Sequence, residues 1–288
     1  MQQIAIAGCG YIGERVAALW RDRGAEVTCL VRTPGKREQL IQEGYQAAIF
    51  DIPGSMVLPS LSASIFYYFI PPPGGGILDT RVKAFLDLIN NSPNPEKIIY
   101  ISATSVYSET KGGVVSENSP AEPVSAMGKR RLEAENSFMD YGQRKNIPVV
   151  ILRVSGIYGP GRLPLMQIRK GEPLLMEDEA GPSNRIHADD LAAICISAAE
   201  KGSAGEIFNV SDGHPTSMTA YFNVVADALG LPRPPQVTME EARRLMSPLM
   251  FSYASESRIV DNSRMLEKLG VKLRYPTLAE GLKALHSN

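Results

Sequence analysis

Three glycines near the amino terminus have the spacing of a loop that holds phosphate groups. Gly8, Gly10 and Gly13 follow directly on the apolar run 4–7 and open a helical pattern. In such a turn the first glycine permits the tight bend, the second lets the backbone approach a pyrophosphate, and the third lets the helix pack closely on the strand. The free N–H groups and the positive dipole end of the helix then face the phosphates. The residues that we expect to contact a bound dinucleotide are Gly8, Gly10, Tyr11, Ile12 and Gly13.

The residue that ends the second expected strand bears on the choice of cofactor. Strand 26–31 ends at Arg32, and Thr33 and Lys36 follow closely. An acidic residue here would accept the adenosine ribose hydroxyls of NAD, whereas a planar guanidinium suits the 2′-phosphate of NADP. This loop therefore favours NADP, with NAD as the alternative. The other interpretation is an ordinary solvated loop.

Length and composition exclude several classes of partner. The 288 residues contain 44% hydrophobic side chains, and 30 basic against 31 acidic residues give a formal net charge of −1. This balance gives no electrostatic reason to expect nucleic acid or an anionic membrane as partner, so we predict a small-molecule substrate. No basic-then-apolar leader opens the chain and no apolar run approaches the ~20 residues that span a bilayer, so we expect a cytoplasmic protein. Cys9, Cys29 and Cys195 are expected to be reduced core residues, and no metal site is predicted.

Alternating apolar strands and helical patterns predict an α/β fold. Further strands are expected near 46–50, 64–70, 97–102, 148–154 and 206–210. Their near-continuous apolar runs are typical of a parallel sheet with helices on both faces, a Rossmann-type doubly wound arrangement. After about residue 211 the pattern changes to helices with Pro-rich joints, which predicts a small, mostly helical carboxyl-terminal substrate lobe. We expect residues 1–158 to form the dinucleotide-binding domain with 186–210 returning to it, and 159–185 and 211–288 to form the substrate-binding lobe.

Ligands of such sheets bind at the carboxyl ends of the strands, near the switch in strand order. The loops expected there are 8–13, 32–37, 51–52, 71–76, 102–105 and 155–162. In the run 71–76 three prolines without N–H groups precede three glycines of great conformational freedom. This run is either a hinge beside the nicotinamide position or a simple turn.

Several further segments, taken together and in order, point to a family. They are Val106-Tyr107, Leu152-Arg153-Val154, 156–162, 185–192, 207–212, Asn262-Ser263-Arg264 and Leu269-Gly270. In these segments the chain resembles the extended short-chain dehydrogenases/reductases, the superfamily that contains NAD-dependent epimerases and dehydratases of nucleotide sugars. The resemblance implies that Asp51 and Ile52 flank the adenine and that residues near Pro71 and Ser102 line the nicotinamide end. It also implies a homodimer formed through two helices on one face of the sheet.

The catalytic helix of that family is where this sequence departs from the pattern. The family uses a Tyr-x-x-x-Lys pair, in which the lysine holds the nicotinamide ribose and lowers the pKa of the phenol that supplies the proton. The i, i+4 spacing puts both side chains on one helix face. The best alignment puts Met127 at the tyrosine and Arg131 at the lysine. A thioether has no proton to give and a guanidinium stays charged, so this pair cannot act as a tuned acid and base.

The serine or threonine that binds the substrate oxygen in the family is also displaced here. Counting back from Val106 places Ala103 at that position, with Ser102 and Thr104 on either side. The predicted catalytic residues are therefore Thr104, Ser102 and Arg131, and the predicted substrate residues are Tyr158 and Arg162. The alternative for Arg130 and Arg131 is a solvated helix face.

Four other side chains are candidate substitutes for the missing acid. They are Tyr107, Lys129, Tyr158 and His187. Packing or a place in the substrate lobe is the favoured interpretation of both tyrosines, and Lys129 is expected to face solvent. His187 is expected to be structural, because it precedes Asp189, a good N-cap for a helix over 190–200.

Two functional hypotheses follow from this pattern. The first is an NAD(P)-binding oxidoreductase or epimerase/dehydratase-like enzyme of an atypical branch, which acts on an unidentified small molecule such as a nucleotide sugar. The alternative is a non-catalytic NADP(H)-binding sensor or scaffold that acts through a protein partner. The intact glycine loop and the second lobe favour the enzyme, whereas Met127 and Arg131 favour the sensor.

Overall fold

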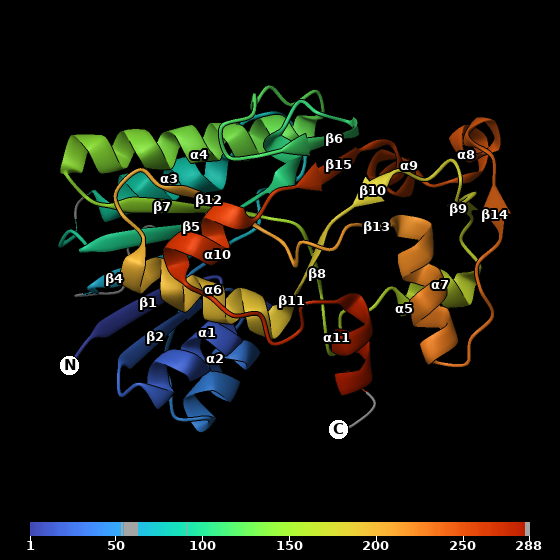
Figure 1. Ribbon diagram of the computed structural model, residues 1–288. Coiled ribbons are helices and arrows are strands. Elements are labelled where there is room, and N and C mark those ends of the chain that lie inside the picture. The colour runs from blue at the N-terminus through green and yellow to red at the C-terminus, as the bar shows by residue number, and fades with distance from the viewer. Residues whose placement is uncertain (53, 55–62, 91, 286–288) are drawn as a thin grey trace.

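A computed structural model describes residues 1–52, 54, 63–90 and 92–285 (Figure 1). Its central sheet has seven parallel strands in the order β12-β7-β5-β4-β1-β2-β3. The strands are β1 (Gln3–Ala7), β2 (Glu26–Val31), β3 (Gln46–Ile49), β4 (Ile65–Tyr68), β5 (Lys97–Ala103), β7 (Val149–Val154) and β12 (Ile207–Val210). The strand order reverses between β1 and β4, where ligands bind in doubly wound sheets. The predicted Rossmann-type α/β fold is confirmed.

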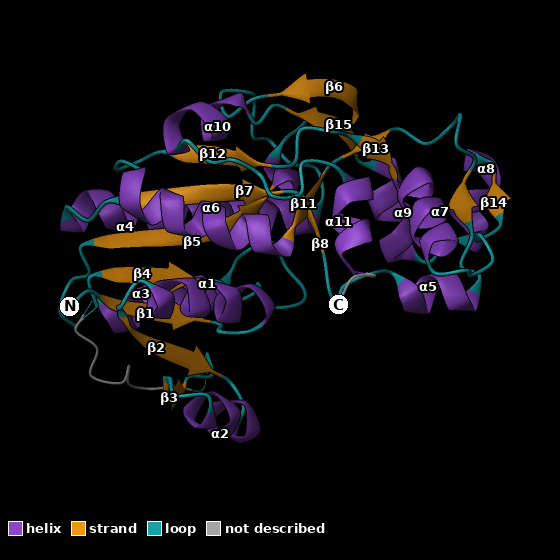
Figure 2. Cartoon of the chain, turned by 60° about the horizontal axis from the view of Figure 1, so that its bottom comes forward, coloured by secondary structure: helices purple, strands orange, loops and turns teal. Residues whose placement is uncertain are grey.

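Helices cover both faces of the sheet, as the apolar strands require. On one face lie α1 (Tyr11–Asp22), α2 (Pro34–Gln42) and α6 (Ala188–Lys201), and on the other lie α3 (Thr80–Ile89) and α4 (Ala126–Lys145) (Figures 1 and 2). Successive strand side chains point to opposite faces. In β1, Ile4 and Ile6 therefore join the core under α1 and α6, and Ala5 and Ala7 join the core under α3 and α4.

Helix α6 begins two residues earlier than the predicted cap allows. Its N-cap is His187, whose Nδ1 accepts a hydrogen bond from the backbone N–H of Asp189 at 3.2 Å. The prediction of Asp189 as the N-cap is wrong, because the imidazole nitrogen already fills that role. The Asp189 carboxylate instead accepts a hydrogen bond from Arg15 Nε at 2.8 Å, which joins α6 to α1.

A second lobe with a core of its own lies beyond the carboxyl ends of the strands (Figure 1). Its elements are α5 (Leu165–Lys170), β9 (Leu174–Leu175), β10 (Pro182–Ser183), β13 (Thr216–Ser217), α7 (Met218–Ala228), β14 (Gln236–Val237), α8 (Met239–Leu245), α9 (Pro248–Ser255) and α11 (Leu278–Leu285). Buried side chains such as Leu174, Phe222 and Leu282 pack there separately from the two cores of the sheet. Met246 and Met250 belong to this core as well.

Short strand pairs join the two lobes. β8 (Gly156–Tyr158) pairs with β11 (Arg185–His187), and β6 (Lys111–Val115) pairs with β15 (Ser257–Val260), both in parallel. The 3-10 helix η1 (Thr104–Val106) follows β5. Helix α10 (Ser263–Leu269) departs from the predicted division at residue 211, because its Met265 and Leu269 are fully buried in the core of the sheet beside α6.

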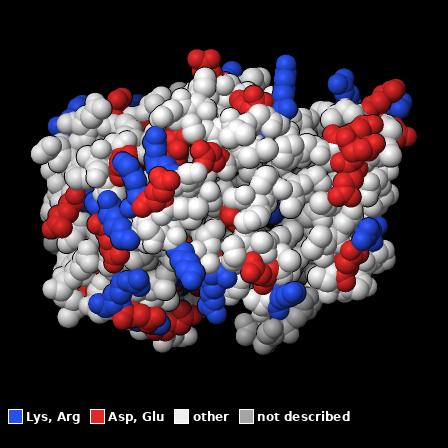
Figure 3. Space-filling view, in the orientation of Figure 1, with Lys and Arg blue, Asp and Glu red and all other residues white. Residues whose placement is uncertain are grey.

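The three cysteines are buried and unbridged, as the prediction of reduced core residues requires. The Sγ atoms of Cys9 and Cys29 lie 2.9 Å apart. Among the described residues, no helix has the length and apolar character that crossing a bilayer needs. Figure 3 shows basic and acidic side chains interspersed over the lobe that contains the central sheet, and mainly acidic ones on the outer end of the second lobe.

Candidate functional site

The three glycines of the first loop meet three different structural demands. Gly8 has φ of +85°, and a Cβ there would lie 2.8 Å from the backbone nitrogen of Ile70. A Cβ on Gly13 would lie 3.0 Å from the carbonyl oxygen of Gly8, so the helix could not pack as closely. A Cβ on Gly10 would meet no protein atom within 4 Å. The loop thus leaves open space in front of the amino terminus of α1, where an anion is favoured.

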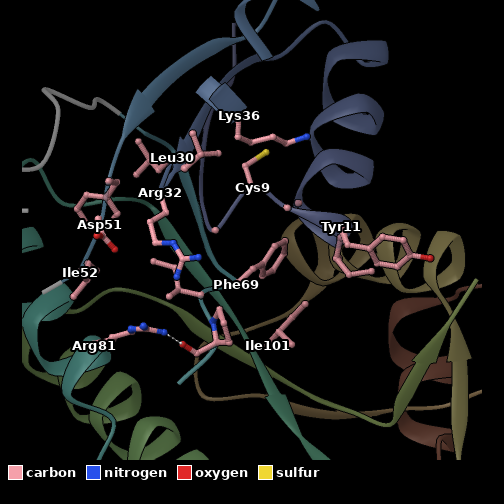
Figure 4. Close-up of a pocket in the computed structure, with 18 of the residues that line it drawn as sticks. Cys9, Tyr11, Leu30, Arg32, Lys36, Asp51, Ile52, Phe69, Arg81 and Ile101 are labelled. Atoms are coloured by element: carbon pink, nitrogen blue, oxygen red, sulfur yellow. Dashed lines mark hydrogen bonds between the residues drawn. The ribbon is translucent and has the colours of Figure 1, made fainter. Parts of the chain in front are cut away.

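This space belongs to a cavity of about 510 Å³ at the carboxyl ends of β1, β2 and β4 (Figure 4). Nearly all the residues predicted to bind the cofactor line it, namely Gly8, Gly10, Tyr11, Ile12, Gly13, Arg32, Asp51, Ile52 and Pro71. Figure 4 shows the Arg32 side chain extending from the end of β2 into the cavity. Lys36 also lines the wall, but its Nζ is paired with Glu14 at 2.7 Å.

The proline–glycine run is fastened at its proline end. Arg81 Nη1 donates a hydrogen bond to the carbonyl oxygen of Pro71 at 2.9 Å, and Arg130 Nη1 donates to that of Pro73. Gly75 and Gly76 have φ of +77° and +67°, which glycine adopts readily. The run therefore turns away from the cavity with Pro71 in the cavity wall.

A second cavity of about 470 Å³ lies between the two lobes. It is lined by the other predicted site residues, namely Ser102, Thr104, Met127, Arg131, Tyr158 and Arg162. Ile101, Arg131, Ile157 and Arg162 line both cavities, so the two spaces meet at these side chains. Ser102 Oγ is buried and has no hydrogen-bond partner among the described residues. A buried hydroxyl in a cavity wall is a donor available to a bound molecule.

Helix α4 presents Met127 and Arg131 to the second cavity from the same face. Arg131 Nη1 donates hydrogen bonds to the carbonyl oxygen of Ile101 at 3.1 Å and to the Tyr100 hydroxyl at 3.3 Å, which fixes the guanidinium between the two cavities. The interpretation of Arg130 and Arg131 as a solvated face is wrong, because Arg130 is 8% exposed and Arg131 is half-buried. Lys129 is exposed, as predicted.

The remaining acid candidates have structural partners. Tyr107 is buried, donates to Asn209 Oδ1 at 2.6 Å and lines neither cavity. The His187 ring caps α6 and lies 4.0 Å from the Tyr275 ring, and burial lowers its pKa. Tyr158 lines the second cavity but donates to the carbonyl oxygen of Thr277 at 3.3 Å, and burial raises its pKa. The packing interpretations of Tyr107 and His187 are therefore supported by their contacts.

Tyr11 ties the glycine loop to the segment between the cavities. Its hydroxyl donates to the carbonyl oxygen of Pro160 at 3.0 Å. The guanidinium carbons of Arg15 and Arg162 lie 4.1 Å and 5.2 Å from its ring centroid. Gly159 has φ of +148°, and a Cβ there would lie 2.8 Å from the Tyr11 hydroxyl. The segment 159–162 is therefore fixed against the start of α1.

Sequence reasoning missed several residues of the two walls. They are Arg81 in the first cavity and Arg185, Met218, Tyr221, Phe222, Tyr253, Glu256 and Arg258 in the second. A signal existed for one of them, because Arg185 is the basic residue of a short, otherwise apolar segment and lies two positions before His187. Residues two apart in a strand share a face, so Arg185 could have been placed beside a residue already considered for the site.

The middle of the chain matches a known family model. Residues 77–211 match the model of the NAD dependent epimerase/dehydratase family. This part of the chain is thus similar to an NAD-dependent epimerase/dehydratase domain.

Individual relatives extend this similarity over the full chain. Protein YeeZ of Escherichia coli strain K12 is 27% identical over 290 residues, which is 96% of this chain and 97% of that protein. The dTDP-D-glucose 4,6-dehydratase of Mus musculus is 30% identical over 131 residues, which is 43% of this chain and 37% of that enzyme.

Solved structures show the same architecture. A functionally unknown conserved protein from Silicibacter pomeroyi DSS has a TM-score of 0.86 and 29% identity, and covers 100% of this chain and 99% of its own. UDP-glucuronic acid 4-epimerase from Bacillus cereus in complex with NAD has a TM-score of 0.78 at 22% identity, with 99% of this chain and 98% of that chain covered. At that identity the likeness concerns the fold.

Proposed function

We propose that this protein is a member of the NAD-dependent epimerase/dehydratase family and an NADP(H)-dependent oxidoreductase or epimerase-type enzyme that acts on a small molecule in the second cavity. The observation that carries this proposal is the meeting of the two cavities at Arg131. A nicotinamide ring bound there supplies a hydride or accepts one. An electropositive side chain between a dinucleotide space and a second enclosed space suits such a reaction.

The first cavity fits a dinucleotide. The empty space beside Gly10 and the amino terminus of α1 suit a pyrophosphate. Arg32 has no hydrogen bond or ion pair to the described residues and extends into the cavity, so its guanidinium is free to grip a 2′-phosphate. The Bacillus cereus epimerase is described with NAD. Our preference for NADP comes from Arg32 in this chain.

The residues of the second cavity suit a reaction in which stabilisation of an anion matters more than delivery of a proton. Met127 has no proton to give, and Arg131 stays charged at neutral pH. The remaining N–H groups of Arg131 can hold a developing oxyanion, as preorganised donors do. The Ser102 hydroxyl, buried without a partner, can hydrogen-bond the same oxygen. Water then supplies the proton.

Calorimetric titration with NADPH and NADH tests the cofactor. Arg32→Ala should raise the Kd for NADPH by about 10- to 150-fold, because a hydrogen bond to a charged group contributes about 1.5–3 kcal/mol, and should leave NADH binding nearly unchanged. Arg37→Ala is the matched control, because Arg37 follows the same strand but lies outside the cavity and donates to the carbonyl oxygen of Ala47 at 3.3 Å. Absence of binding by either dinucleotide would refute the proposal.

A dinucleotide-binding sensor is the second candidate, and Met127 is the observation that favours it. Turnover by the unaltered protein in the presence of cofactor distinguishes the two. The enzyme is supported if the unaltered protein oxidises or reduces any compound of a carbonyl and nucleotide-sugar panel. The sensor is supported if the unaltered protein binds cofactor without turnover while its association with another protein changes between NADP and NADPH.

We also propose a homodimer through the α3–α4 face. Ile77, Leu78 and Val124 are 53%, 59% and 80% exposed beside these helices. Ile77 and Leu78 also line a hollow of about 380 Å³ with Pro123 and Leu132. Burial of these apolar side chains against a second copy would remove them from water. Light scattering should give twice the chain mass of 31.3 kDa, and Leu78→Asp should give the monomer mass.

A further inference from the structure

A buried guanidinium without a carboxylate partner lies in the wall of the second cavity. Arg185, in β11, is 8% exposed and lines the cavity beside Tyr221. Its Nη1 donates to Ser183 Oγ at 3.0 Å, and this is its only side-chain hydrogen bond to the described residues. It forms no ion pair with them either, and the buried Asp212 carboxylate acts on it only through an electrostatic attraction without direct contact. A buried charge without a partner is costly, so the remaining donors of Arg185 are available to an anion that enters the cavity.

Arg258 in the same wall is an arginine whose guanidinium nitrogens all have partners within the protein. Its Nε donates to the carbonyl oxygen of Glu109 at 2.8 Å and its Nη1 to that of Thr104 at 2.6 Å. Its Nη2 is paired with Glu256 at 3.2 Å. All three guanidinium nitrogens of Arg258 therefore donate inside the protein, whereas only one nitrogen of Arg185 does so among the described residues.

Neighbouring side chains hold Arg185 in place. Its guanidinium carbon lies 3.9 Å from the centroid of the Tyr221 ring. Its hydrogen-bond acceptor, Ser183 Oγ, itself donates to the carbonyl oxygen of Thr216 at 2.8 Å. Burial lowers the pKa of Arg185 to about 10, which leaves it charged at neutral pH. A fixed, planar and partly desolvated cation is well suited to bind a carboxylate or phosphate through two N–H groups.

The charge of the whole wall points the same way. Four arginines line the second cavity, namely Arg131, Arg162, Arg185 and Arg258. The one carboxylate among the described lining residues is Glu256, which is paired with Arg258. The chain as a whole has a formal net charge of −1, so this positive excess is local. A cavity lined by one sign of charge concentrates ligands of the opposite sign.

We propose that Arg185 is an anion-binding residue of the second cavity and that the molecule bound there carries a carboxylate or a phosphate group that docks on it. The description of this molecule as a substrate rests on the proposed function, whereas the anion site rests on the contacts of Arg185. A neutral analogue would leave the guanidinium unpaired. Neutral analogues should therefore bind at least tenfold more weakly than the anion.

Calorimetry with two simple probes tests the site in the full chain. Malate serves as the carboxylate probe and inorganic phosphate as the phosphate probe, each titrated at constant ionic strength with saturating NADPH in the first cavity. At least one probe should bind, and Arg185→Gln should raise its Kd at least tenfold. Arg169→Gln is the matched control, because Arg169 is an exposed arginine of the same lobe and lines neither cavity.

Thermal unfolding without any anion separates binding from a purely structural role. Arg185→Gln should melt at the same temperature as the unaltered protein or higher, because it removes an unpaired buried charge. Arg185→Lys keeps the charge without the planar fork, so the Kd of the probe should rise by a smaller factor than in Arg185→Gln. This second variant gives the same test if Arg185→Gln does not fold.

Each outcome has one meaning. Binding of malate alone or of phosphate alone, lost in the Arg185 variants, supports the proposal and identifies the group that docks. Binding of neither probe, or undiminished binding in both variants, overturns it. NADPH binding without probe binding refutes this inference and leaves the proposed function standing. The protein could instead bind neither NADPH nor NADH and still bind a probe, without cofactor, in a way that depends on Arg185. That result refutes only the proposed function.

Discussion

Replacement of Gly10 by alanine would show whether the open space before α1 holds the cofactor. A Cβ at position 10 meets no protein atom within 4 Å, whereas a Cβ at position 8 would lie 2.8 Å from the backbone nitrogen of Ile70. Gly8 also has φ of +85°, which an alanine adopts only with strain, while Gly10 has φ of −107°. The same methyl group placed two residues apart should therefore affect binding at one site and folding at the other.

The two free energies can be worked from these contacts. The methyl group at position 10 meets no protein atom, so Gly10→Ala should lower the free energy of unfolding by less than Gly8→Ala does. In Gly8→Ala the left-handed conformation alone costs about 1–2 kcal/mol, and the contact with Ile70 adds to it. In Gly10→Ala the methyl group displaces a phosphate oxygen from the N–H groups of α1. The loss of one charge-assisted hydrogen bond of about 1.5–3 kcal/mol raises the Kd for NADPH by about 10- to 150-fold.

Urea unfolding and calorimetric titration with NADPH measure both quantities on the same samples. Gly35→Ala is the control, because its Cβ also meets no atom within 4 Å but Gly35 lies in α2 outside the cavity. It should raise the free energy of unfolding by about 0.4–1 kcal/mol and leave the Kd for NADPH unchanged. Undiminished NADPH binding by Gly10→Ala would refute the placement of the pyrophosphate beside this residue. Loss of folding in Gly10→Ala would refute the open space itself.

Three further outcomes are expected. Glu135→Gln should lower the free energy of unfolding by about 3–5 kcal/mol, because it leaves Arg153, which is 4% exposed and paired with Glu135 at 2.7 Å, as an uncompensated buried charge. In the control Glu200→Gln, which breaks an exposed pair with Arg23 at 3.7 Å, the loss in urea unfolding should stay below about 1 kcal/mol, and equal losses in both variants would contradict the reasoning. Burial raises the pKa of Asp212 from 3.8 to about 6, so the folded state holds a proton that the unfolded state has released, and this contribution to stability is lost as the pH rises through that interval. Asp212→Asn should therefore gain up to about 3 kcal/mol relative to the unaltered protein between about pH 4 and about pH 7 in urea unfolding, and a constant difference across that range would show that Asp212 does not titrate in this way. Met127→Tyr with Arg131→Lys should raise turnover of a carbonyl substrate by about 100-fold if proton delivery limits the rate, measured as NADPH oxidation with Met127→Phe and Arg131→Lys as the control that lacks the hydroxyl.

The fold was predictable from the sequence because its signals are local. The strand that ends before Gly8 and the helix after Gly13 are fixed by apolar patterning and by glycine chemistry within a few residues. The strands expected near 97–102 and 148–154 appear as Lys97–Ala103 and Val149–Val154, because continuous apolar runs are typical of strands covered on both faces.

The wall of the second cavity was less predictable because distant contacts decide it. Arg130 is buried because its Nη1 meets the carbonyl oxygen of Pro73, 57 residues away. Arg185 points into the cavity because β11 pairs with β8 and α7 brings Tyr221 over its guanidinium. The predicted N-cap of α6 was two residues too late for a local reason. Both His187 and Asp189 can accept the capping hydrogen bond, and only the backbone shows which of them does.

The separate core of the second lobe has a consequence for how this protein can diverge. Tyr221 and Phe222 contribute one edge to the second cavity and another to the core that they share with Leu174 and Leu282. The side chains that support the glycine loop are not part of that core. They pack in the two cores of the sheet. Substitutions that change the shape of the second cavity therefore disturb the packing of the second lobe alone. Related proteins can thus evolve to bind different ligands there while the lobe that contains the central sheet stays unchanged.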